Sequence, residues 1–166
     1  MNRVVLLFSL FVAALAAAGC SSSAPVSKQP VDQTLLLAAE PADPVEVLDA
    51  KDQAKDGEAV VIVGRLGGGV KPWIDGRAAF LLVDTRVLPA CKEGEKCDEN
   101  CPGCSEAMLQ ASTMVKFLDR NGRVRLVDAR DLLGVKEEQT VVVRGVASRD
   151  KAGNLSVAAE KIFVRR

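Results

Sequence analysis

Runs of apolar, largely β-branched residues separated by short polar stretches dominate the chain from residue 59 onward and predict strands. The run over 59–66 is apolar at nearly every position, which indicates a strand buried on much of both faces. Gly64 inside this run suggests a bend or bulge where the strand curls. The pattern therefore predicts a mainly β domain. Four more strands are predicted, over 78–83, 113–118, 140–147 and 155–164.

Turn and helix signals lie between these runs. The pair Asn121-Gly122 predicts a tight turn after the third strand, with Val124 returning in the partner strand of a hairpin. Asp128 is placed to cap a short helix, and Gly134 is placed to end it. A short helix is therefore expected between the third and fourth strands.

The stretch before the first strand predicts a lead-in helix. Asp43 can cap this helix, Pro44 suits its first position, and Glu46 completes a capping-box arrangement. Gly57 is a natural stop for it. Residues 31–42 are compatible either with a loose helix packed on the domain or with more linker, and the sequence leaves both open.

This order of elements resembles the OB-fold, a small Greek-key barrel. The resemblance covers roughly residues 45–166 and implies a five-stranded OB-fold-like barrel with a short helix between strands three and four, a lead-in helix and a Cys-rich loop insert. The lead-in helix also resembles that of small bacterial periplasmic OB-fold proteins, and the whole assembly resembles exported lipoproteins of planctomycete-type bacteria. Because one fold hosts many functions, the resemblance implies only a binding module. It is carried by Val60 to Leu66, Ala78 to Asp84, Thr113 to Leu118, Asp128 to Gly134, Thr140 to Ala147 and Leu155 to Val164.

The N-terminus has the features of an export signal with an acylation site. A basic start at Arg3 is followed by apolar residues 4–18, a stretch shorter than the ~20 residues of a spanning helix. The closing Ala17-Ala18-Gly19-Cys20 resembles the bacterial lipobox, in which the cysteine is diacylated and begins the mature chain. It departs from the usual pattern at Ala17, where leucine is commoner.

The lipobox resemblance implies a compartment and a division of the chain. Acylation of Cys20 would anchor the protein to a membrane while its polypeptide stays in water. We therefore expect a lipid-anchored, extracytoplasmic protein of the cell envelope, on the periplasmic side of a bacterial membrane. The expected segments are a lipoprotein signal peptide (1–19), the acylated cysteine with a flexible tether (20–42), and the OB-fold-like domain (43–166) with its Cys-rich insert (85–112).

The amino-acid composition excludes several classes of function. The chain has no histidine, which excludes His-based acid–base catalysis, Ser-His-Asp triads and His metal sites. Aromatic residues make up only 4% of the chain, so extended stacking surfaces are not expected. Since no catalytic motif is recognised either, we expect neither an enzyme nor a resident cofactor.

Opposite charges gather in the two halves of the chain. Residues 21–112 carry 9 Lys/Arg and 15 Asp/Glu, whereas residues 113–166 carry 12 Lys/Arg and 7 Asp/Glu. Such halves usually pair or mix on the surface of one globule. The alternative is a separate basic patch that meets phosphate-bearing partners. The sequence leaves both arrangements open.

Four cysteines lie within the predicted insert, with the spacing Cys91-x5-Cys97-x3-Cys101-x2-Cys104. In an exported protein this even cluster indicates first a disulfide framework, for which three pairings are possible. The alternatives are a metal site formed by all four thiolates and a redox-active pair at Cys101 and Cys104, next to a possible helix over 105–109. A thiol-disulfide or metal-handling envelope protein is therefore the competing functional class.

The usual binding face of an OB-fold barrel comprises strands two and three and the neighbouring loops. Phe80 and Phe117 are expected to fill the core, because they share a strand face with other apolar residues. We expect a non-catalytic binding or adaptor module that engages an envelope protein or glycan. Nucleic acid or an oligosaccharide on the barrel face is a weaker alternative, since nucleic acid needs clustered cations and stacking aromatics. The candidate binding residues are Trp73, Arg77, Lys116, Arg123 and Arg125.

Overall fold

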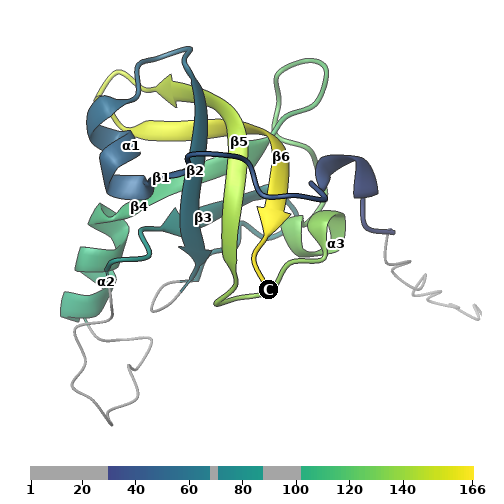
Figure 1. Ribbon diagram of the computed structural model, residues 1–166, viewed down its shortest axis with the longest axis horizontal. Coiled ribbons are helices and arrows are strands. Elements are labelled where there is room, and N and C mark those ends of the chain that lie inside the picture. The colour runs from purple at the N-terminus through teal and green to yellow at the C-terminus, as the bar shows by residue number, and fades with distance from the viewer. Residues whose placement is uncertain (1–29, 68–70, 88–101) are drawn as a thin grey trace, which may run out of the picture.

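The computed structural model describes residues 30–67, 71–87 and 102–166, and Figure 1 shows a β-barrel with short helices around it. The strands are β1 (Val45–Glu46), β2 (Ala59–Leu66), β3 (Ala79–Val83), β4 (Ser112–Phe117), β5 (Thr140–Arg149) and β6 (Leu155–Val164). The helices are the 3-10 turn η1 (Gln33–Leu35) and the α-helices α1 (Val47–Gln53), α2 (Pro102–Gln110) and α3 (Ala129–Leu133).

Five of the strands close into a barrel in the order β2, β3, β4, β6, β5, with β5 pairing back onto β2. β4 and β6 run parallel, and the other barrel pairs are antiparallel. β1 is an extra short strand, parallel to β2. Because α3 lies between the third and fourth barrel strands, this is the OB-like arrangement expected from the sequence.

The predicted strands and the short helix are confirmed. β2 and β6 have the expected bounds, β3 and β4 differ by one residue at their ends, and β5 is two residues longer. Asp128 caps α3 by accepting a hydrogen bond from the backbone N–H of Arg130, and Gly134 ends it with a φ of 69°. The tight turn before α3 is also present, with a β-bridge between Leu118 and Val124.

Apolar side chains fill the barrel. Phe80 and Phe117 are buried as predicted, with their ring centroids 6.5 Å apart. Neither ring is therefore available to stack on a ligand. Other completely buried members of the core include Ile62, Leu66, Leu82, Val115, Val141, Val143, Val157 and Ile162.

Gly64 lies where β2 bends from one partner strand to another. β2 pairs with β5 up to Arg65 and with β3 over its last two residues. A Cβ atom at position 64 would lie 2.5 Å from Leu82 Cγ and 2.7 Å from the carbonyl oxygen of Val83. The bend predicted at this glycine therefore coincides with a close approach of β2 to β3.

The predicted capping box of the lead-in helix is wrong. α1 begins at Val47, and Glu46 at its N-cap position makes no side-chain capping bond. Asp43 lies upstream of the helix, with a φ of 51°. The helix ends at Gln53, and Gly57 lies in the turn that follows. The cap comes from elsewhere in the chain and is described with the site below.

Residues 31–42 lie along the barrel. The backbone N–H of Asp32 donates to the carbonyl oxygen of Leu132 at 2.8 Å, and that of Leu37 donates to Ile162 at 2.8 Å. Of the two alternatives for this segment, packing on the domain is the one observed. The packed part of the chain therefore begins before the lead-in helix.

Candidate functional site

Trp73, the first candidate of the predicted binding face, is half-buried between the barrel and α3. Its indole Nε1 donates to Glu137 Oε1 at 2.9 Å. The guanidinium of Arg130 lies 5.7 Å from the ring centroid, and the ring meets Phe80 edge-on with centroids 6.2 Å apart. The indole of this candidate binding residue is therefore held by contacts on several sides.

Arg130 ties the loop that carries Trp73 to α3. Its Nε and Nη2 atoms donate to the two carboxylate oxygens of Asp128 at 2.7 and 2.6 Å, and Nη2 also donates to Asp75 Oδ1 at 2.9 Å. The bond from Arg130 lowers the pKa of Asp128 to about 2, and the same bond raises the pKa of Arg130 above its ordinary value. These charge-assisted bonds fix the loop before β3 against α3.

The four basic candidates occupy two places. Lys116 lies on β4, where its Nζ donates to a serine hydroxyl of β6 at 3.3 Å. Arg77 is exposed just before the start of β3, and Arg123 is exposed beyond the end of β4. Arg125 forms an ion pair with Asp32 at 3.4 Å. Arg125 and the residue after Arg77 are joined by a backbone hydrogen bond of 3.0 Å. The structure thus brings three of the four cations to one end of the barrel.

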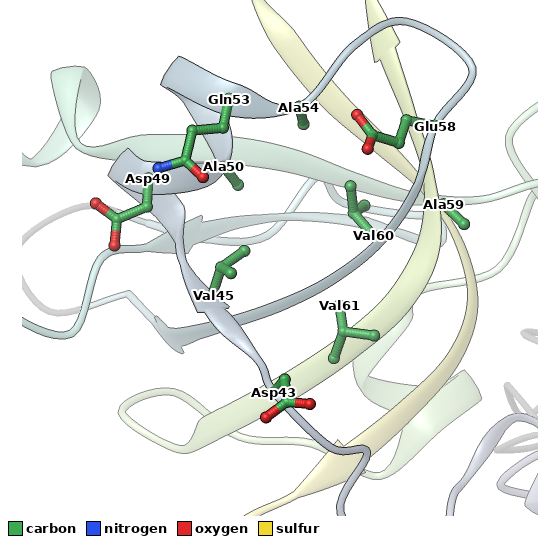
Figure 2. A pocket seen from close by; sticks show the side chains of 10 residues that line it. All are labelled: Asp43, Val45, Asp49, Ala50, Gln53, Ala54, Glu58, Ala59, Val60 and Val61. Carbon is green, nitrogen blue, oxygen red and sulfur yellow. The ribbon is translucent and has the colours of Figure 1, made fainter.

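A pocket that the sequence did not predict lies between α1, β1 and the start of β2 (Figure 2). Its volume is about 260 Å³. Three valines form its middle, and three carboxylates stand around them (Figure 2). The valines are Val45, Val60 and Val61, and the carboxylates are those of Asp43, Asp49 and Glu58.

The carboxylates around this acidic pocket keep much of their capacity to bind a cation. Asp49 Oδ1 lies 3.2 Å from a guanidinium nitrogen of Arg86, and Glu58 Oε2 accepts a backbone N–H bond at 2.8 Å. Asp43 makes no hydrogen bond or ion pair with any described residue. Residues 43–58 contain six acidic and two basic side chains, so the pocket carries net negative charge.

A buried polar network fixes α1, one wall of the acidic pocket. Asp84, at the end of β3, is completely buried, and its Oδ2 accepts from the backbone N–H of Leu48 at 2.9 Å. Arg86 donates to both Asp84 oxygens, at 3.0 and 2.9 Å. Glu46 accepts from the backbone N–H and the hydroxyl of Thr85. The helix is therefore capped by a carboxylate 36 residues away in sequence.

The size and lining of the acidic pocket suit a cationic side chain. Its volume of about 260 Å³ lies below the roughly 300–1,000 Å³ of pockets for drug-sized molecules. A lysine or arginine can lay its methylene stem on apolar surface while its charged head stays at a polar rim. The carboxylates would accept charge-assisted hydrogen bonds from that head.

The thiol predictions fall on parts of the chain that are not described. Cys20, Cys91, Cys97 and Cys101 lie outside the described residues, and Cys104 is placed only by its backbone within α2. The possible helix next to it is confirmed as part of α2. The disulfide, metal and redox alternatives therefore stay predictions.

Among the side chains that the structure describes, in ranges 30–67, 71–87 and 106–166, no group of three or more Cys, Asp or Glu is placed to hold a metal ion. No helix of that part of the chain is long and apolar enough to cross a membrane.

The fold defines the class of protein as an OB-like β-barrel with one added strand. No model of a known protein family matches the chain, and no curated protein matches its sequence. A more specific function therefore has to follow from the surface features of the barrel.

The sequence did not predict the acidic pocket because its walls depend on contacts between distant parts of the chain. One wall is α1, whose cap is distant in sequence. Another is the extra strand β1, which has only two residues and is too short to show the alternation of apolar and polar residues typical of a strand. The available signal was the density of acidic residues over 43–58. A charge run of this kind is more often a solvated surface than a site.

Proposed function

We propose that this protein is a non-catalytic binding or adaptor module of the cell envelope, anchored through acylated Cys20, which holds a basic side chain of a partner protein in the acidic pocket. The observation that carries the proposal is a pocket of side-chain size in which three valines lie among three carboxylates. The buried Asp84 network supports it, because it fixes α1 to the barrel before any partner binds.

A protein partner is favoured over a glycan by the chemistry of the lining. Carboxylates form their strongest pairs with guanidinium and ammonium groups, which proteins present and neutral glycans do not. The face predicted from the OB resemblance offers less to a sugar ring, since Arg130 covers Trp73. The partner segment is therefore expected to be basic.

We expect neutralisation of the acidic pocket to reduce capture of the partner. A photo-crosslinking amino acid at Gln53, on the pocket rim, should link in cells to a protein segment that contains lysine or arginine. Asp43→Asn together with Glu58→Gln should lower the yield about tenfold, since two charge-assisted pairs are lost. The linked peptides and their yields are measured by mass spectrometry.

The matched control for this experiment removes the same charge elsewhere. Asp52→Asn together with Glu160→Gln changes two exposed carboxylates that do not line the acidic pocket, and the yield should stay unchanged. Linked segments without lysine or arginine would contradict the proposal, as would equal loss of yield in the two double variants.

We expect Cys20→Ser to abolish the membrane anchor. The lipobox-like junction offers a thiol only at Cys20, and a hydroxyl cannot form the thioether of the acylated residue. Labelled fatty acid should be absent from the variant, which should accumulate as uncleaved or released chain. Cys91→Ser is the control and should keep the label. Incorporation of label into the Cys20→Ser chain would refute acylation at this site.

A further inference from the structure

The turn after β4 exposes large apolar side chains at one end of the barrel. Leu126 is 77% exposed and Leu118 is 38% exposed. They flank the turn over 119–122, which projects from the barrel in Figure 1. Ile74, in the neighbouring loop before β3, is 41% exposed. Apolar side chains exposed together at one end of a molecule mark an interaction surface.

Exposed arginines accompany these leucines. Arg77 and Arg120 form no ion pair with any residue that the structure describes. Arg123 is 78% exposed and forms a long ion pair with Asp119, at 3.9 Å. Residues 116–130 contain five basic and two acidic side chains, so this end is positively charged. The hairpin surface is defined here as Arg77, Leu118, Arg120, Arg123 and Leu126.

The chain that leads from Cys20 joins the domain beside the hairpin surface. Asp32 forms its ion pair with Arg125, the residue before Leu126. In Figure 1, η1 and the turn after β4 lie on the same side of the molecule. Ten residue steps separate Cys20 from Pro30, and they span at most about 35 Å. An anchor at Cys20 would therefore keep this end of the barrel close to the membrane.

We propose that the hairpin surface docks on the anionic lipid headgroups of the membrane that holds acylated Cys20. The inference rests on the proposed acylation. The two leucines enter the headgroup layer, and the three arginines pair with lipid phosphates, an arrangement that combines apolar burial with attraction to anionic lipid. Charge complementarity selects anionic lipid over a zwitterionic surface.

The β5–β6 loop provides a reference position outside the hairpin surface. Arg149, at the end of β5, donates to Asp56 and to the carbonyl oxygen of Ala54, which places this loop beside α1. In Figure 1, the β5–β6 loop and the turn after β4 lie at the top of the view, on its left and right. A probe in the β5–β6 loop therefore reports on a part of the barrel that the hairpin surface does not include.

The test places a fluorescent reporter on the acylated, processed chain. An environment-sensitive fluorescent amino acid replaces Leu126, and in a second chain it replaces Lys151 in the β5–β6 loop. Each chain is reconstituted into vesicles of phosphatidylethanolamine with phosphatidylglycerol, or of phosphatidylcholine alone. We expect a blue shift of the emission at position 126 on phosphatidylglycerol vesicles only, and no shift at position 151 on either.

Charge variants then test the role of the arginines. Arg77→Gln, Arg120→Gln and Arg123→Gln together should abolish the shift at position 126 while the chain still floats with the vesicles. The matched control changes three exposed cations elsewhere and should keep the shift. It combines Lys55→Gln, Lys136→Gln and Arg144→Gln.

Flotation separates the two proposals. A chain that floats without a shift at position 126 overturns docking and leaves the anchor standing. A chain that does not float overturns the anchor and the docking with it. A shift that survives the triple arginine variant, or one that single-stranded DNA or a soluble protein produces without vesicles, assigns the hairpin surface to another partner and also overturns docking.

Discussion

Replacing Asp84 with asparagine is expected to lower the free energy of unfolding by roughly 3 kcal/mol at neutral pH. The carboxylate is completely buried and accepts hydrogen bonds from Arg86 and from the backbone N–H of Leu48. An asparagine has one oxygen in place of two, so its amide nitrogen would face a donor. The substitution would also remove the cap of α1 and loosen one wall of the acidic pocket.

The same carboxylate predicts how stability depends on pH. Burial alone raises the pKa of Asp84, but the bonds from Arg86 and from the backbone N–H of Leu48 outweigh it and leave the pKa below its ordinary value. A carboxyl whose pKa is lower in the folded than in the unfolded state stabilises the fold above the unfolded pKa of ~3.9. That contribution is lost as the pH falls through the folded value. The difference in the free energy of unfolding between Asp84→Asn and the parent protein should therefore become smaller at low pH.

Urea unfolding monitored by circular dichroism, at pH 7 and at pH 3, measures the destabilisation and its dependence on pH. Asp49→Asn is the matched control, because it removes the other carboxylate that contacts Arg86, at 3.2 Å, from an exposed site. An exposed ion pair of this kind contributes at most about 1 kcal/mol. Equal destabilisation by the two substitutions would show that burial of Asp84 does not dominate the network.

The strands and α3 could be predicted because their signals are local. Each barrel strand contains an apolar run long enough to be recognised, and β2 (Ala59–Leu66) and β5 (Thr140–Arg149) are rich in β-branched residues. For α3, the capping Asp128 and the terminating Gly134 lie within a few residues of one another. Local preference and tertiary environment agree in these elements, so the sequence pattern was sufficient.

The start of α1 and the environment of Trp73 could not be predicted because their partners are distant in sequence. The capping box at Asp43 is compatible with local rules, but Asp84 supplies the cap from the end of β3. Trp73 was expected to contribute to the binding face, and it is held by Glu137 and Arg130 from beyond β4. The acidic pocket depends on the same long-range contacts, since one of its walls is α1.

The close packing of β5 against β6 leads to a second large effect, at Gly145. The register between these strands shifts between Arg144 and Gly145, so that Gly145 pairs with Ala159. A Cβ atom at position 145 would lie 2.3 Å from the carbonyl oxygen of Ala158 and 2.9 Å from Ala159 Cα. These are backbone atoms of a neighbouring barrel strand, and no side-chain rotation can move them away.

We therefore expect Gly145→Ala to destabilise the protein by about 3 kcal/mol or more, at the upper end of the usual effect of overpacking, because the ladder between β5 and β6 must separate to admit the methyl group. Ser148→Ala, at an exposed position of the same strand, is the control and should change the free energy of unfolding by less than about 0.5 kcal/mol. Urea unfolding of both variants measures the difference. If Gly145→Ala and Ser148→Ala changed the free energy of unfolding equally, the space between β5 and β6 at Gly145 would have to admit a side chain. That result would contradict the close packing described here.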